Sequence, residues 1–204
     1  MKKSISRRTL VFLSVCVIAG CASAPEPEPV SEQPVAVVPE TAMLNFVDAI
    51  ALMQGGEAQR AQEIFEQLAS GYPQYSGPWI NLGILHASAG RVQEAEAAFG
   101  EAVRLNPDSA AAWTELGILY RRQGRFQDAR QAYEQAIGAD AQYALAYRNY
   151  GILLDLYLAE PAAALEAYRH YQALDAEQDK QVESWIVEVS RRVDAEQRTA
   201  RVSP

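Results

Sequence analysis

Large apolar residues recur along much of this chain at spacings of three and four, which places them on one face of an α-helix. Trp79 and Leu82 form one such pair, and Trp113 and Leu116 form another. Hydrophobic residues make up 49% of the chain, a share that fits a well-packed helical array. The pattern predicts an all-α fold.

The apolar pattern repeats at a fixed period, which is the interval from Trp79 to Trp113. Three early positions of the repeat recur in successive copies: Trp79, Leu82 and Gly83, then Trp113, Leu116 and Gly117, then Tyr147, Tyr150 and Gly151. Five later positions keep the same phase: Gly90, Ala95, Phe99, Ala102 and Pro107, answered by Gly124, Ala129, Tyr133, Ala136 and Ala141. We expect the glycines at 83, 117 and 151 where a neighbouring helix approaches closely, because a larger side chain would hold the backbones apart.

An aromatic residue, a leucine and a glycine, followed by alanine, aromatic, alanine and proline in a unit of about 34 residues, resemble the tetratricopeptide repeat. The resemblance implies a right-handed α-solenoid of helix-turn-helix units, since one unit cannot bury its apolar face alone. A repeat domain at 41–178 with about four units is expected, at residues 42–75, 76–109, 110–143 and 144–178. The fourth unit carries a one-residue insertion between Tyr150 and Tyr168.

Residues 179–199 form a further amphipathic segment. Its apolar face comprises Val182, Trp185, Ile186, Val189 and Val193. We expect this helix to cap the open end of the stack, with residues 200–204 as a tail.

Residues 1–20 resemble an export signal, with four basic residues followed by the apolar stretch Leu10–Gly20. That stretch has eleven residues, too few for a membrane span, which needs about 20. Ile18 to Cys21 resembles the lipobox of bacterial lipoproteins, which implies cleavage before Cys21 and its acylation, for example with palmitate. The alternatives are a plain signal peptide with an incidental cysteine, or a buried hydrophobic helix. Ser6–Leu10 also resembles a twin-arginine signal.

Residues 21–40 predict a tether rather than a packed segment. Between Ala22 and Glu40, five of nineteen residues are proline, with four glutamates between them. Such a segment favours extended polyproline II and spans up to roughly 60 Å. Since Ala22 rather than aspartate follows the cysteine, the lipoprotein resemblance implies the outer membrane, facing the periplasm.

Composition disfavours nucleic acid as a partner, and nothing in the sequence points to a catalytic site. Removing the four positive charges of the signal changes the net charge from −8 to −12, which suits neither phosphate backbones nor anionic lipid surfaces. With Cys16 removed and Cys21 acylated, no thiol remains for catalysis or zinc binding. His86 and His170 are interpreted as a packing residue and a surface residue. No catalytic residue, metal site or cofactor is therefore predicted.

The repeat resemblance implies a concave groove lined by the first helix of each unit. The positions carried over are Ile80, Asn81, Ile84, Thr114, Glu115, Ile118, Arg121, Arg122, Arg148, Asn149, Ile152 and Asp155. Ile84, Ile118 and Ile152 would form an apolar stripe that suits a peptide or the chain's own terminal segment. Alternatively, these isoleucines pack between helices of adjacent units.

The sequence predicts a non-catalytic scaffold or adaptor on the periplasmic face of the outer membrane. It would bind periplasmic or envelope proteins or peptides and assist assembly of a pilus, motility, Ton-like or outer-membrane machine. The alternative is a regulatory adaptor for cell-wall hydrolases or proteases, and an enzyme is a third, disfavoured class. The oligomeric state stays open.

Overall fold

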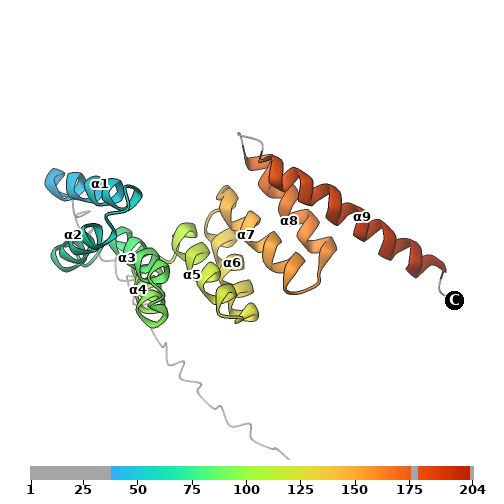
Figure 1. Ribbon diagram of the computed structural model, residues 1–204, viewed down its shortest axis with the longest axis horizontal. Coiled ribbons are helices and arrows are strands. Elements are labelled where there is room, and N and C mark those ends of the chain that lie inside the picture. The colour runs from blue at the N-terminus through green and yellow to red at the C-terminus, as the bar shows by residue number, and fades with distance from the viewer. Residues whose placement is uncertain (1–37, 176–178, 203–204) are drawn as a thin grey trace, which may run out of the picture. The chain divides into compact units, whose positions relative to one another are not determined.

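The computed structural model describes residues 38–175 and 179–202, which form nine α-helices and no strand. The helices are α1 (Glu40–Gln54), α2 (Ala58–Gly71), α3 (Ser76–Ser88), α4 (Val92–Leu105), α5 (Ala110–Arg122), α6 (Phe126–Ala139), α7 (Ala144–Leu156), α8 (Pro161–Leu174) and α9 (Lys180–Val202). Figure 1 shows them in chain order from α1 at one end of the array to α9 at the other. The all-α prediction is confirmed.

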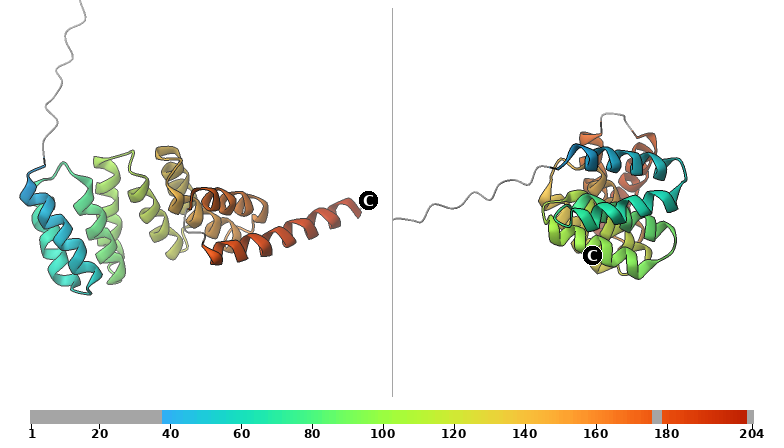
Figure 2. Two further views of the ribbon diagram at one scale, coloured as in Figure 1. Left: turned by 90° about the horizontal axis from the view of Figure 1, so that it is seen from above. Right: turned by 90° about the vertical axis from the view of Figure 1, so that its left-hand side faces the viewer.

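Successive helices pair into hairpins: α1 packs on α2, α3 on α4, α5 on α6, and α7 on α8. The second helix of each hairpin packs on the first helix of the next, and α5 also contacts both α3 and α7. The paired helices therefore stack side by side, as Figure 2 shows. This is the right-handed α-solenoid that the repeat pattern predicts.

The second, third and fourth hairpins are each closed by a glycine on the first helix and an aromatic ring on the second. A Cβ built on Gly83 would lie 2.4 Å from a ring carbon of Phe99. The same contact recurs between Gly117 and Tyr133 and between Gly151 and Tyr168. The glycines therefore lie where neighbouring helices approach, as predicted. The space beside each glycine is filled by the aromatic ring on the second helix of the same hairpin.

The turns inside the first three hairpins each place a glycine in the left-handed region. These residues are Gly56, Gly90 and Gly124, with φ of 83°, 74° and 77°. In the fourth hairpin Ala159 takes this conformation, with φ of 55°. Because Ala159 comes one position later than the even spacing of the three glycines predicts, the inserted residue lies in or before this turn.

A polar link joins each of the last three turns to the second helix of the preceding hairpin. Arg91 donates to Gln62 Oε1 at 2.8 Å, and Arg125 donates to Glu96 Oε1 at 2.8 Å. At the next junction the charges are exchanged, since Arg130 on α6 donates to Glu160 in the turn. The donor of the link can therefore lie in the turn, as at Arg91 and Arg125, or on the preceding helix, as at Arg130.

Helix α9 covers the end of the last hairpin. Val182 and Val189 are buried, and Trp185 lies 5.4 Å from the ring of Tyr168, measured between centroids. Burying this apolar face against α8 shields the open end of the stack from water, as expected of a capping helix.

Two helix ends differ from the predicted segment boundaries. α1 begins at Glu40, within the predicted tether, because extended Pro39 precedes it and the Pro39 carbonyl accepts hydrogen bonds from Ala42 and Met43. α9 continues to Val202, into the predicted tail, where Ala200 and Arg201 favour a helix. Among the residues that the structure describes, no helix combines the length and apolar character that a membrane span requires.

Candidate functional site

The first helices of the four hairpins, α1, α3, α5 and α7, form one surface of the array, the groove. Isoleucine recurs at one position of all four helices, as Ile50, Ile84, Ile118 and Ile152, and each is half-buried. Ile84 packs against the cluster that contains Phe99. Ile118, Ile152 and Ile50 contact the clusters at the neighbouring seams in the same way.

The alternative assignment of the isoleucines therefore holds, because they pack between adjacent units rather than form a free stripe. Two of them also face the groove, because Ile84 and Ile118 line a pocket between α3 and α5. This pocket, the Glu115 pocket, has a volume of about 170 Å³ and is lined by Ile84, Ala87, Ser88, Phe99, Glu115, Ile118, Leu119 and Arg122. The structure thus brings four of the predicted groove residues together.

Glu115 supplies the acidic group of this pocket. Burial raises the pKa of its carboxyl group above the ordinary value. Within the described part of the chain, neither Glu115 nor Arg122 makes an ion pair or a side-chain hydrogen bond. The pocket therefore offers one half-buried carboxylate beside apolar side chains, with Ser88 and the exposed Arg122 also in its lining.

A larger and almost wholly apolar pocket lies where α1, the end of α2 and the start of α3 meet. Its volume is about 260 Å³, and its lining includes Met43, Phe46, Val47, Tyr72 and Tyr75. The side chains of Met43 and Val47 are 58% and 61% exposed. Contiguous exposed apolar surface is a mark of interaction sites. We call it the N-terminal pocket.

Sequence reasoning missed the N-terminal pocket, although a signal for it exists. Val47, Asn81 and Glu115 follow one another at the interval of the repeat, so Val47 occupies the same position of its unit as the other two. The predicted groove positions belong to the second to fourth units. The same position in the first unit is Val47.

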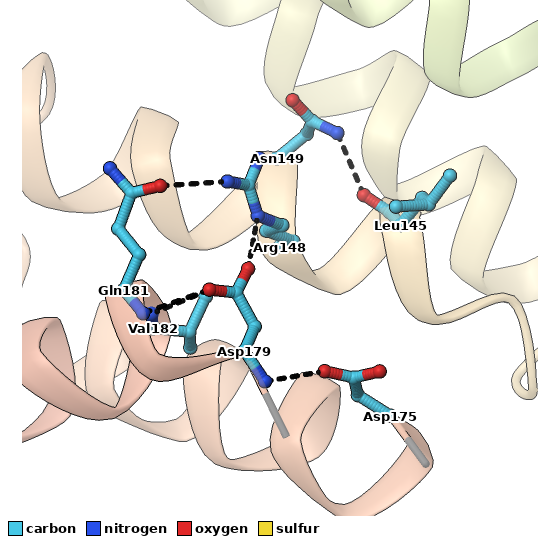
Figure 3. A network of polar contacts seen from close by, with 7 residues as sticks. All are labelled: Leu145, Arg148, Asn149, Asp175, Asp179, Gln181 and Val182. Carbon is cyan, nitrogen blue, oxygen red and sulfur yellow. Dashed lines mark hydrogen bonds and ion pairs between the residues drawn. The ribbon is translucent and has the colours of Figure 1, made fainter. Parts of the chain in front are cut away.

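The fourth-unit end of the groove is covered by α9. Arg148 contacts Asp179 at 3.4 Å and Gln181 at 3.5 Å, and its guanidinium lies 5.3 Å from the ring centroid of Trp185. Figure 3 shows the contacts of Arg148 with Asp179 and Gln181 at the start of α9. Further along α9, Arg192 pairs with Asp155. Arg148 and Asp155 therefore bind α9, so the C-terminal segment of the chain itself occupies this end of the groove. A terminal segment of the chain is one of the two groove occupants that the sequence suggests.

Thr114 does not line the groove, and that prediction is wrong. Its side chain is 2% exposed, because α5 turns this position into the packed interior, and its hydroxyl has no hydrogen-bond partner among the described residues. Asn81 and Asn149 are half-buried and donate to carbonyls of their own helices, Gly77 and Leu145, at 3.0 and 2.9 Å.

The remaining groove positions lie apart from the two pockets. Arg121 reaches the hydroxyl of Tyr133 at 3.4 Å and lies 5.7 Å from the ring centroid of Tyr157. Ile80 is half-buried on α3. Cys21, the predicted lipidation site, lies outside the described residues.

The histidines and carboxylates of the described segments form no evident catalytic set. His86 is half-buried and accepts a hydrogen bond from Arg91 at 3.0 Å, whereas His170 is exposed and stacks on Tyr147. No cluster of three or more potential metal ligands occurs in residues 38–175 and 179–202.

Two family models match the chain. One describes the cilia and flagella-associated protein 70 C-terminal domain, a tetratricopeptide domain, and matches residues 28–146. The other describes the tetratricopeptide repeat and matches residues 114–179. No curated protein matches the sequence significantly.

Solved structures share the fold at low sequence identity. PilF of Pseudomonas aeruginosa is 16% identical with a TM-score of 0.70, over 76% of this chain and 70% of PilF. MamA of Desulfovibrio magneticus RS-1, solved from residue 41 to its end, is 20% identical with a TM-score of 0.62, over 81% of this chain and 92% of the solved one. TTC0263, a protein of Thermus thermophilus with the same repeats, is 19% identical with a TM-score of 0.62, over 74% and 82% of the two chains.

Proposed function

The chain belongs to the tetratricopeptide repeat family, and we propose that it is a non-catalytic adaptor that holds a segment of a partner protein in its groove. The open part of the groove runs from α1 to α5, because α9 covers the end at α7. A repeat scaffold of this family supports protein–protein interaction, and the proposal assigns that interaction to the two pockets.

The exposed apolar side chains of the N-terminal pocket carry this proposal. Met43 and Val47 are more than half exposed beside a cavity whose walls are apolar, although both lie within a regular helix. Covering such surface removes apolar area from water, which favours association. An apolar partner segment therefore fits this end of the groove.

The proposal also includes the cellular setting. The lipobox-like residues before Cys21 support anchoring by a lipid, and Ala22 supports the outer membrane, with the groove in the periplasm. The adaptor would there assist assembly of an envelope machine, such as a pilus, motility, Ton-like or outer-membrane assembly system. The proline-rich residues 22–40 would keep the groove at a distance from the membrane.

Site-specific photo-crosslinking in cells tests the groove. A photoreactive residue at Val47 should give a discrete protein adduct, and Val187, which is 51% exposed on α9, is the matched position that should not. The adduct is identified by mass spectrometry, and Met43→Glu should abolish it in a protein that stays helical. Equal adducts from both positions, or none from Val47, would contradict groove binding.

A separate experiment tests the anchor. The protein should fractionate with membranes and incorporate labelled palmitate, and Cys21→Ala should lose both properties. An unmodified Cys21 in an otherwise processed protein, seen by mass spectrometry, would exclude lipid anchoring while leaving the groove proposal intact.

A further inference from the structure

Glu115 differs chemically from the residues at the same position in the neighbouring units. Asn81 and Asn149 lie one repeat before and one repeat after it, and each uses its amide to donate to a carbonyl of its own helix. An ionised carboxylate has no hydrogen to donate, so Glu115 cannot make this bond. Its oxygens remain available as acceptors.

In the described segments no cation pairs with this carboxylate. No ion pair or side-chain hydrogen bond within them involves Glu115, and burial is the cause of its raised pKa, without an opposing contribution from a nearby guanidinium. Arg122 lines the same pocket but is exposed. A half-buried carboxylate without a partner is unfavourable, and a cation that contacts it removes part of that cost.

The walls of the Glu115 pocket suit the stem of a basic side chain. Ile84, Ile118 and Leu119 are apolar, and the pocket volume of about 170 Å³ suits a side chain rather than a larger group. Lysine and arginine bury their methylene groups along apolar surface while the charged end stays polar. An acidic side chain would instead be repelled by Glu115.

We propose that the Glu115 pocket binds a lysine or arginine side chain of the partner segment, so that Glu115 determines specificity within the groove. This inference rests on the proposed function. The partner segment then has two features: an apolar residue for the N-terminal pocket and a basic residue for Glu115. Interaxial distances of about 8–10 Å place α5 roughly 16–20 Å from α1, which an extended chain crosses in about five or six residues.

Selection of phage-displayed random dodecapeptides on the purified full chain tests this inference. Wild type should enrich peptides that carry lysine or arginine about five or six residues from a bulky apolar residue. Glu115→Gln, which keeps the shape and removes the charge, should weaken binding of a selected peptide about tenfold or more. Glu63→Gln, at an exposed carboxylate on α2, is the matched control and should leave affinity unchanged.

The outcomes separate this inference from the proposed function. Glu115→Arg should shift the selected peptides toward acidic residues at the same position, which would support the inference further. Peptides that lack a basic residue and bind Glu115→Gln equally well, but are lost with Met43→Glu, would overturn the inference and leave the groove function intact. Selection of no peptide would overturn both.

Discussion

The ring of Tyr133 lies directly against Gly117, so that a Cβ built on this glycine would come within 2.6 Å of the ring carbon Cε1. The glycine is on α5 and the ring is on α6, and both are buried. Adjacent helices can approach here only because the glycine has no side chain. The contact recurs in the hairpins on either side and sets the packing of each unit.

Gly117→Ala should destabilise the protein by about 1–3 kcal/mol, since the ring or the helix must move to admit the methyl group. Gly117→Leu should cost at least as much. The control is Gly138→Ala on α6, where no described atom beyond the neighbouring residues and the helix's own backbone lies within 4 Å of the new Cβ, and this change should stabilise the helix by up to about 1 kcal/mol. Chemical denaturation measures both, and equal effects at the two glycines would contradict the packing role of the Tyr133 ring.

Ala159→Gly should stabilise the protein by up to about 1 kcal/mol. Ala159 has φ of 55° in a turn where the other three hairpins use glycine. This region costs an L-residue roughly 1–2 kcal/mol, partly offset by the entropy of glycine. Ala97→Gly, at an exposed position within α4, should instead destabilise by about 1 kcal/mol. Thermal unfolding distinguishes the two, and a loss of stability from both would show that the Ala159 turn is not strained.

The repeat could be predicted from sequence because its strongest constraints are steric and local to one unit. An aromatic ring needs a small residue beside it, so the glycine and the aromatic residue recur together, as at Gly117 and Tyr133. In the fourth unit the separation from Gly151 to Tyr168 is one residue longer, which reveals the inserted residue. Spacing could not establish which surface each groove position faces. Thr114 is buried and the isoleucines lie at seams, because contacts with the neighbouring helices decide their burial.

The polar links between units were also missed, although the sequence contains them. Gln62, Glu96 and Arg130 recur at the interval of the repeat, and the partner of each follows 29 or 30 positions later in the chain. The exchange of charge at the last junction obscures the pattern, because no single residue type is kept. The sequence signal for these links is a pair of residues that can donate and accept a hydrogen bond, separated by 29 or 30 positions.

Reversing the charges of the last link should test whether its polarity matters. Arg130→Glu alone places two acids together and leaves Glu160 without its donor, so it should destabilise the protein. Arg130→Glu with Glu160→Arg restores the arrangement found at Arg125 and Glu96 and should recover about 0.5–1 kcal/mol relative to the sum of the single changes. A double-mutant cycle by denaturation measures the coupling, and additive effects would show that the pair contributes nothing.

His86 should make the protein less stable at acidic pH. Burial first, and then the charge of Arg91, lower the pKa of its imidazole, while Glu66 and Glu94 act in the opposite direction. Since the pKa is lower in the folded state, the unfolded state binds the proton more readily. The stability that neutral His86 contributes is therefore fully present above the unfolded-state pKa of about 6.5. It is lost as the pH falls from there through the folded-state pKa.

His86→Tyr removes this titration. It places a tyrosine beside Arg91, as in the next unit, where Tyr120 occupies the equivalent position. The difference in unfolding free energy between variant and wild type should grow in favour of the variant as the pH falls from about 8 to about 5. A difference that stays constant over this range would contradict a lowered pKa at His86.

Arg148→Glu should loosen α9 rather than only alter the groove, which revises the expectation that this position acts in partner binding alone. The substitution replaces attraction to Asp179 by repulsion and removes the cation from the face of Trp185. Because the Arg192–Asp155 pair and the buried Val182 and Val189 still hold the helix, we expect local opening rather than global unfolding.

Hydrogen exchange measured by mass spectrometry should show severalfold faster exchange in residues 180–193, while α3 to α6 keep their protection. Trp185 fluorescence should shift toward that of a solvated indole. Asn149→Ala is the matched control, because Asn149 bonds only to Leu145 of its own helix in the network of Figure 3. Unchanged exchange of α9 in Arg148→Glu would mean that the apolar face alone seats the capping helix, and Arg148 would again be available to a partner.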